Sequence, residues 1–298
     1  MNKIQLDRMH EGKGFIAALD QSGGSTPKAL RDYGIPDETY FNKEDMFNLV
    51  HQMRTRIITS KSFDSQKILG SILFENTMDR KIDDMYTADY LWEKKGVIPF
   101  LKIDKGLQTE ENGVRLFKPM PDLDSLLQRA VERHIFGTKE RTVINKANKE
   151  GIKAIVEEQF KIGMKVASYD LVPILEPEVT ITIPDKAEAE AILKEEIIKN
   201  IEKLPADTKI MLKLSLPTVD GLYDDLAQDP HIVRVVALSG GYSQKEADRL
   251  LKRNKNMIAS FSRALSQGLN IHQSDREYEK LLTTSIDNIY DASVNKNQ

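Results

Sequence analysis

Eight short apolar runs rich in β-branched residues recur along the 298-residue chain, and segments with a helical period separate most of them. The runs are 14–19, 67–74, 97–103, 141–145, 171–179, 209–216, 233–241 and 257–262, and the helical segments are 44–60, 122–135, 148–166, 186–203, 243–253 and 276–292. Ser243 and Glu246 form a capping-box pattern before one helical segment. The alternation predicts an α/β fold in which residues 1–298 form a single (β/α)8 TIM barrel, with an open doubly wound sheet as the alternative.

Four charged residues stand 37 positions apart in or near these runs: Lys102, Lys139, Glu176 and Lys213. One strand, its returning helix and their loops take about 30 residues in such a barrel. The interval therefore predicts that the four residues lie on neighbouring strands and face one cavity. Active sites of these barrels lie at the C-terminal ends of the strands, which makes the four residues candidate site residues.

Lys213 is expected to point into the barrel. Successive strand residues face opposite sides, so Leu212 and Leu214 would pack against the outer helices. An uncompensated ammonium group is costly to bury, so an inward lysine must be paired or chemically employed. A lysine that reaches solvent from a strand end, or a structural ion pair, is the simpler alternative.

Further charges accompany Lys213 on the neighbouring strands. Glu176 and Glu178 share one face, and two close carboxylates tend to raise the pKa of one of them, a shift that nearby lysines would oppose. The other charged pairs are Lys102 with Asp104 on the third strand, and Lys139 with Arg141 at the start of the fourth.

The chemistry of a lysine amine suggests a catalytic function for this cluster. A lysine becomes a good nucleophile when apolar surroundings or an adjacent cation lower its pKa, and Lys139 and Lys102 would supply that cation for Lys213. The free amine condenses with a ketone to an iminium ion, whose charge weakens the bond two carbons away. Glu176 has the residue type and expected position to move the protons that these steps require.

Two loops late in the chain predict a phosphate site. Ser239 and Gly240 end the seventh strand, where two consecutive glycines let backbone N–H groups approach an anion. Ser262 and Arg263 end the eighth strand, and a guanidinium group holds phosphate oxygens in a bidentate way. Loops after these two strands often bind phosphate, so a phosphorylated substrate is expected. The stretch 21–25 could bind a second phosphate, with an ordinary loop as the simpler reading.

Composition excludes several classes of function. The formal net charge of −3 gives no basic surface for nucleic acid. Cysteine is absent, which excludes thiolate nucleophiles, and the five histidines lack metal-ligand spacing, so neither metal nor other cofactor is expected. The chain shows no signal-peptide core and no apolar stretch of about 18 residues, which predicts a cytoplasmic protein without a membrane partner. Whether it forms a homo-oligomer is left open.

Seven stretches between residue 12 and about residue 265 carry a family resemblance: GKGFIAALDQSGGS, ILFENT, IPFLKIDKG, PILEPEV, KIMLKLSLP, ALSGGYSQKEA and FSRAL. Together they resemble the class I fructose-bisphosphate aldolases, in the shorter form found in bacteria. The resemblance implies a (β/α)8 barrel. It also implies reversible cleavage of fructose 1,6-bisphosphate to glycerone phosphate and glyceraldehyde 3-phosphate through a lysine Schiff base, in glycolysis and gluconeogenesis.

The resemblance further implies roles for individual residues. Lys213 would be the Schiff-base lysine, Glu176 the principal general acid/base and Glu178 its support. Lys139 would supply positive charge during imine formation. The remaining expected contacts are Asp20 and Lys102 at the substrate hydroxyls and carbinolamine, Arg141 among the substrate-binding residues, Ser239, Gly240, Ser262 and Arg263 at the phosphate of the ketone half, and Ser22, Ser25 and Lys28 at the other phosphate.

The chain departs from the family pattern at several positions. Lys28 is followed by Ala29 where many relatives have arginine, so the second phosphate is expected to be held differently. Ser262 stands where glycine is usual, which still leaves its backbone N–H available. Glu140 replaces a tryptophan. The chain ends in VNKNQ with its last tyrosine at Tyr290, whereas longer relatives end in a tyrosine.

Several alternatives remain at this point. The base for carbon–carbon cleavage is Glu176, with Asp20 as a competing candidate. Another Schiff-base barrel, such as a transaldolase, a deoxyribose-phosphate aldolase or an aldolase for tagatose 1,6-bisphosphate, would use the same lysine chemistry. A metal-dependent aldolase would need clustered histidines, and a non-catalytic binding protein on the same fold is possible in principle.

Overall fold

Eight parallel strands pair in chain order and form a barrel. The computed structural model describes residues 1–22 and 26–297, without the side chains of residues 263 and 264. The strands are β1 (Phe15–Leu19), β2 (Ile68–Leu73), β5 (Ile98–Lys102), β7 (Gly137–Ile144), β8 (Val172–Val179), β9 (Ile210–Ser215), β10 (Ile232–Leu238) and β11 (Met257–Ala259). Because β11 lies beside β1, the order closes on itself. A doubly wound sheet has its first strand inside the order, so the predicted barrel is confirmed and the open sheet is wrong.

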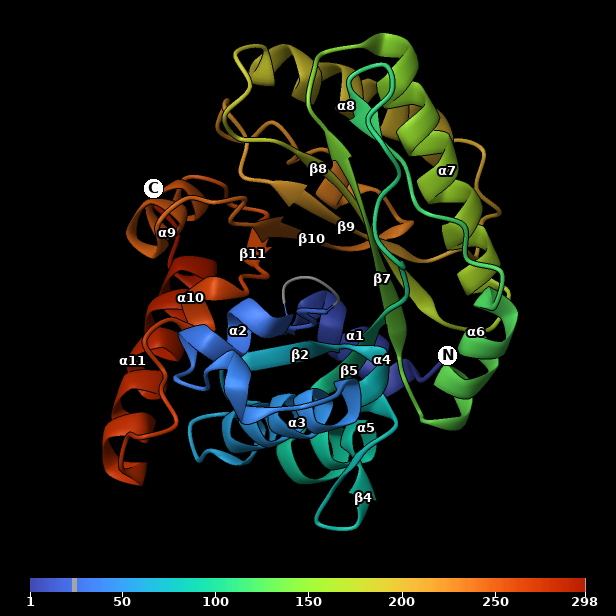
Figure 1. Ribbon diagram of the computed structural model, residues 1–298. Helices are drawn as coiled ribbons and strands as arrows, with labels where there is room; N and C mark the ends of the chain where they lie inside the picture. Colours follow the sequence, from blue (N-terminus) through green and yellow to red (C-terminus); the bar gives the residue numbers. More distant parts are fainter. Residues whose placement is uncertain (23–25, 298) are drawn as a thin grey trace.

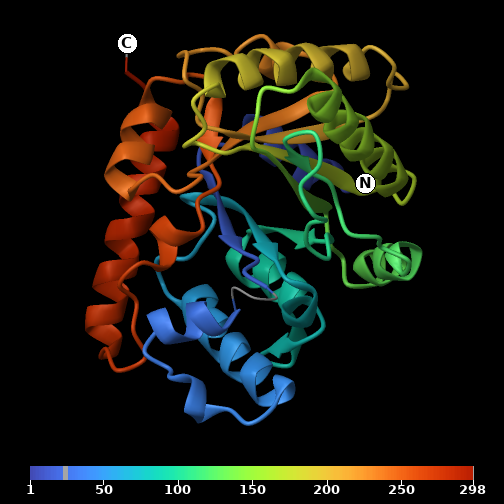
Figure 2. The same ribbon diagram turned by 45° about the horizontal axis from the view of Figure 1, so that its top comes forward.

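Helices surround the barrel (Figure 1). The longer ones are α1 (Lys3–Glu11), α2 (Thr26–Asp32), α3 (Lys43–Thr59), α6 (Leu123–Glu132), α7 (Lys149–Ala167), α8 (Lys186–Ile201), α9 (Gln244–Lys252) and α11 (Asp275–Val294). Shorter elements are α4 (Glu75–Met78), α5 (Thr87–Asp89), α10 (Arg263–Ser266), η2 (Asp37–Thr39), η3 (Tyr90–Lys94), η4 (Leu226–Gln228), β3 (Lys81–Ile82), β4 (Met85–Tyr86) and β6 (Val114–Arg115). Figures 1 and 2 show α7 and α8 together on one flank, and α10 and α11 on the opposite flank.

The strands separate two apolar layers. Met211 belongs to the cluster inside the barrel, whereas Leu212 and Leu214 belong to the cluster between the strands and the helices. This alternation follows from the two-residue period of a strand. It turns Lys213 inward, as the sequence predicts, and leaves its side chain buried.

The fourth barrel strand is longer than its apolar run. Strand β7 begins at Gly137, four residues before the predicted start, so Lys139 lies within the strand and not in front of it. The first half of the strand shows no apolar run in the sequence, because it contains the charged residues Lys139, Glu140 and Arg141. Gly137 is required for packing, because a Cβ there would lie 2.1 Å from the carbonyl oxygen of Val172 on β8.

Helix α1 covers the N-terminal end of the barrel. Its residue Met9 is fully buried in the cluster inside the barrel. Arg234 of β10 donates hydrogen bonds to the carbonyl oxygens of Met9 and Gly12, which holds the helix in place. Asn2 caps the helix by accepting from the N–H groups of Ile4 and Gln5. The C-terminal end of the barrel is therefore the end open to a substrate.

Candidate active site

The four residues spaced by 37 lie on four consecutive barrel strands. Lys102 ends β5, and Lys139, Glu176 and Lys213 lie on β7, β8 and β9. Lys102 stands directly beside Lys139 in the register between β5 and β7. The regular interval thus reflects one strand, one connection and one return to the next strand, as expected for this barrel.

Alternating charges form one buried chain of contacts. Lys213 Nζ lies 3.0 Å from Glu176 Oε1, and Lys139 Nζ lies 2.9 Å from Glu176 Oε2. Lys139 Nζ also lies 2.6 Å from Asp20 Oδ2, at the end of β1. All four side chains are at least nine-tenths buried. Two cations and two anions thus neutralise each other where solvent is excluded, which satisfies the physical requirement for burying them.

These contacts fix the resting protonation of the cluster. Burial raises the pKa of Asp20, but Lys139 and Lys213 outweigh it and hold that pKa well below its ordinary value. Desolvation is likewise outweighed by the two lysines at Glu176, whose pKa is lowered. Burial acts to lower the pKa of Lys139, but Asp20 and Glu176 reverse this and raise it. Asp20 and Glu176 are therefore both ionised. The lysines lower the pKa of each carboxylate by more than burial and the neighbouring carboxylate raise it.

The two oxygens of Glu176 face different lysines. Its Oε2 forms an ion pair with Lys139 but accepts no hydrogen bond from the residues that the structure describes. The other oxygen, Oε1, faces Lys213. A carboxylate placed between two ammonium groups in this way can receive a proton from one side and return it to a group bound in the cavity.

Asp104 organises a second, adjacent network. Its Oδ1 lies 2.6 Å from Lys102 Nζ, and its Oδ2 accepts from the backbone N–H of Arg141 at 3.2 Å. The Arg141 guanidinium pairs in turn with Glu178. Lys102 and Glu178 are thus held by partners of their own and do not touch Lys213, so Lys139 is the cation that shares a carboxylate with it.

Comparison with known proteins decides the family. A family model described as "Glycolytic: Fructose-bisphosphate aldolase class-I" matches residues 2–220. The chain belongs to the class I fructose-bisphosphate aldolases. The "Fructose-bisphosphate aldolase class 1" of Clostridium acetobutylicum is 59% identical to this aldolase over 294 residues, which cover 99% of this chain and 100% of the relative.

Two solved structures share the fold of this aldolase. A fructose-bisphosphate aldolase from Plasmodium falciparum superimposes with a TM-score of 0.77 at 19% identity, covering 99% of this chain and 94% of that one. A protein from Corynebacterium glutamicum superimposes with a TM-score of 0.52 at 12% identity, covering 98% and 92%. At these identities, the likeness concerns the barrel architecture.

The loops predicted to hold the first phosphate lie at the open end of this aldolase. Ser239 and Gly240 follow β10, and Gly240 adopts a left-handed φ of 57°, which glycine accommodates. Ser239 also lines a cavity of about 480 Å³ together with Ser266 after β11. Ser262 Oγ accepts a hydrogen bond from Gln21 at 2.5 Å. Arg263 begins α10, and its side chain lies outside the described part.

The residues expected at the second phosphate do not lie together. Ser22 lines a cavity of about 710 Å³ that also contains Asp20 and Lys139. Lys28 instead lines a smaller, separate cavity, with its side chain 68% exposed and paired with Asp32 at 2.7 Å. Ser25 lies outside the described residues.

Sequence reasoning missed a buried arginine beneath the site. Arg54 of α3 is 1% exposed and donates to the carbonyl oxygen of Gln21 and to Thr77 Oγ1, both at 2.5 Å. It therefore anchors the loop that carries Asp20. Its burial could have been inferred from its helical spacing, because Arg54 lies on the same buried face of α3 as Val50, Met53 and Ile57.

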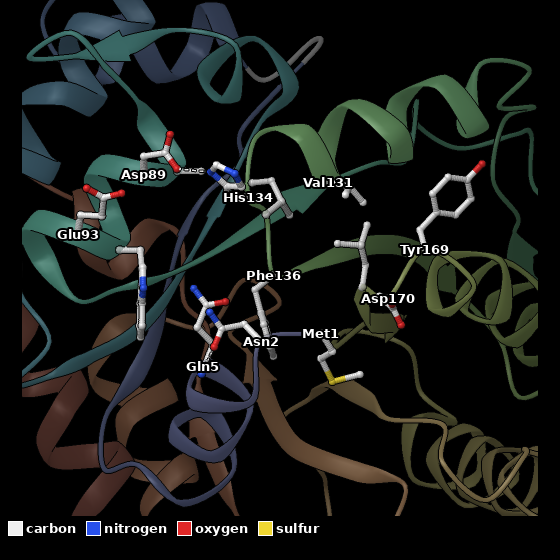
Figure 3. Close-up of a pocket in the computed structure, with 14 residues that line it drawn as sticks. Met1, Asn2, Gln5, Asp89, Glu93, Val131, His134, Phe136, Tyr169 and Asp170 are labelled. Carbon is white, nitrogen blue, oxygen red and sulfur yellow. Dashed lines mark hydrogen bonds and ion pairs between the residues drawn. The ribbon is translucent and has the colours of Figure 1, made fainter.

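A further cavity lies beside α1 (Figure 3). It measures about 470 Å³, and its wall includes Gln5, Phe136 and a hydrogen-bond contact of 2.7 Å between His134 Nδ1 and Asp89 Oδ1. None of the predicted site residues lines it. The cavity at the open end of the barrel is therefore the one connected with the charge cluster.

Two further properties concern only the described part of the chain. No group of three or more histidine, aspartate or glutamate side chains there has an arrangement that could hold a metal ion. Metal independence nevertheless stays a prediction. No helix in the same part combines the length and apolar character needed to cross a bilayer.

Proposed function

We propose that the chain catalyses reversible cleavage of fructose 1,6-bisphosphate through an iminium ion on Lys213. The observation that carries this assignment is the contact of 3.0 Å between the buried Lys213 amine and the Glu176 carboxylate. It provides a nucleophile and a proton acceptor within reach of each other, at the open end of the barrel. Lys139 on the other side of the same carboxylate supplies a fixed positive charge.

Iminium formation uses three of these groups. Glu176 takes a proton from Lys213, whose free amine then attacks the C2 carbonyl carbon of the ketose. The ammonium group of Lys139 stabilises the negative charge that develops on the carbonyl oxygen. Glu176 returns its proton as the carbinolamine loses water, which leaves a C2 iminium ion on Lys213.

Cleavage follows from the charge of the iminium ion. A carboxylate removes the proton from the C4 hydroxyl, the C3–C4 electron pair moves toward the iminium nitrogen, and glyceraldehyde 3-phosphate forms with an enamine left on Lys213. Glu176 is the preferred base and Asp20 the competing one, since both are ionised and both contact Lys139. Protonation of the enamine at C3 and hydrolysis of the resulting iminium then release glycerone phosphate.

Reduction with borohydride tests the covalent step. Treatment with borohydride and glycerone phosphate should add the mass of the reduced adduct to the peptide that contains Lys213. The K213M variant should give no adduct and should lose cleavage by at least about a thousandfold, because nothing replaces the nucleophile. Circular dichroism of K213M checks that it folds. An adduct on another lysine, or full turnover by K213M, would contradict the assignment.

The preference among ketose phosphates and the cellular location belong to the same proposal. Tagatose 1,6-bisphosphate carries the same phosphates and ketone, so a panel of ketose phosphates compared by kcat/KM determines the preference. A transaldolase or deoxyribose-phosphate aldolase would prefer substrates with a single phosphate. We infer a cytoplasmic location from the glycolytic role of the family.

A further inference from the structure

Five basic side chains and three carboxylates line the cavity beside the charge cluster. Asp20 and Lys139 line it, and Glu176 connects Lys139 to Lys213, so the carbonyl carbon of the ketose would react near these two residues. The basic side chains that line the cavity are Lys102, Lys105, Lys118, Lys139 and Arg141. A bisphosphate attached to Lys213 extends its far phosphate away from the cluster, so these side chains can supply the charge that binds it.

Most of these cations already have a carboxylate. Lys139 contacts Asp20, and Lys102 contacts Asp104. The remaining pairs are Lys105 with Glu75 at 2.5 Å, and Arg141 with Glu178. Lys118 differs from them, because the residues described in the structure place no carboxylate within ion-pair distance of its ammonium group. Its full charge is available to a ligand.

The backbone at Lys118 is held in place. Its N–H donates to the carbonyl oxygen of Gly106 at 2.9 Å, and Leu107 faces Phe117 in an antiparallel bridge. Gly106 has a φ of 97°, which turns the chain there. The N–H of Phe117 donates to Glu158 of α7 at 3.0 Å. The ammonium group of Lys118 therefore extends from a fixed loop and can reach the cavity at a small cost in conformational freedom.

We propose that Lys118 binds the phosphate on the aldehyde half of the substrate and thereby selects bisphosphates over monophosphates. This inference rests on the proposed function and assigns to Lys118 the part expected of Lys28. Lys28 is paired with Asp32 and lines a different cavity. A lysine acts as a compact point charge, which suits a phosphate dianion whose orientation is set by the covalent bond at the other end.

The test compares two ketoses that differ at the far phosphate. K118A should raise KM for fructose 1,6-bisphosphate about tenfold or more, because a charge-assisted hydrogen bond is lost. KM for fructose 1-phosphate, which lacks that phosphate, should change less than about twofold. K118R, which restores the charge, should recover most of the selectivity.

A matched variant in the same cavity separates loss of charge from loss of packing. K105A removes a lysine that Glu75 already neutralises, so its effect on the bisphosphate should be clearly smaller than that of K118A. Thermal melting of each variant checks folding. The inference is overturned if K118A affects both ketoses equally, or if K28A and not K118A loses selectivity.

Borohydride trapping tests the Lys213 adduct separately from the phosphate contact of Lys118. Glycerone phosphate lacks the far phosphate, so K118A should form the same Lys213 adduct as the wild-type enzyme. If the wild-type enzyme forms the adduct while K118A keeps full selectivity, the phosphate assignment alone is wrong. If the wild-type enzyme forms no adduct, the proposed function fails and the role of Lys118 fails with it.

Discussion

Glu140 is a buried acid on the outer face of β7, between Lys139 and Arg141. It is fully buried, and its Oε1 has no hydrogen-bond partner among the described residues. Burial and the nearby charge of Asp104 raise its pKa well above the ordinary value, although Thr138 donates to its Oε2 at 3.3 Å. The inward charges of β7 were predictable from the two-residue period, but the protonation of Glu140 depends on the helix that covers it.

The pH dependence of stability should reveal the neutral state of Glu140. A carboxyl group whose pKa is raised in the folded state stabilises fully below its unfolded pKa, near 4.5, and this contribution is lost as pH rises toward the folded pKa. Wild-type stability should therefore fall relative to E140Q as pH rises above about 5, by up to about 1.4 kcal/mol per pH unit. Urea unfolding of both proteins at each pH measures this, and parallel profiles would show that Glu140 is not neutral.

Helix ends show how one sequence pattern gives two outcomes. Ser243 caps α9 by accepting from the N–H of Glu246, as expected, but the Glu246 carboxylate pairs with Arg249 and does not complete the box. Ser274 and Glu277 carry the same pattern and form the complete box at α11. The pattern could be read from the sequence. Competition from a cation one turn away could not, because it depends on side-chain geometry.

Removing the two caps should have unequal effects on stability. S274A should lower the free energy of unfolding by about 1 kcal/mol, because the Ser274 hydroxyl loses two hydrogen bonds and α11 packs along the barrel. The hydroxyl accepts from the N–H of Glu277 at 3.3 Å and donates to the Glu277 carboxylate at 2.7 Å. S243A should cost less, since it removes one bond of 3.3 Å at a helix of two to three turns. Urea unfolding at constant pH compares the two variants, and a larger loss for S243A would reverse this ranking.

At the scale of the whole molecule, the barrel gathers groups that are far apart in the chain. Its eight strands were predictable because each is a local apolar run. Lys105 and Lys118 could not be assigned to the site, because they lie in an aperiodic loop whose direction depends on contacts with β5, β7 and α7. Helix α1 was missed for a related reason: its charged residues Arg8 and His10 resemble a surface segment, yet its Met9 side fills the end of the barrel.

Activity should survive removal of metal ions. The carboxylates of the cluster are already paired with ammonium groups, so a metal ion would have to displace Lys139 or Lys213 to bind there. Initial rates of cleavage should agree within experimental error before and after dialysis against EDTA. A loss of rate that added Zn²⁺ or Mg²⁺ restores would point to a metal-dependent mechanism.

Because α1 covers the N-terminal end of the barrel, substrate and products must all pass through the C-terminal end. Met9 and the side chains above it fill the interior, so molecules cannot pass through from end to end. Both halves of the cleaved sugar must leave by the route along which the intact sugar arrived. In the proposed mechanism the inner half is still bonded to Lys213 when the half nearer the exterior is free, so the two products should leave in a fixed order.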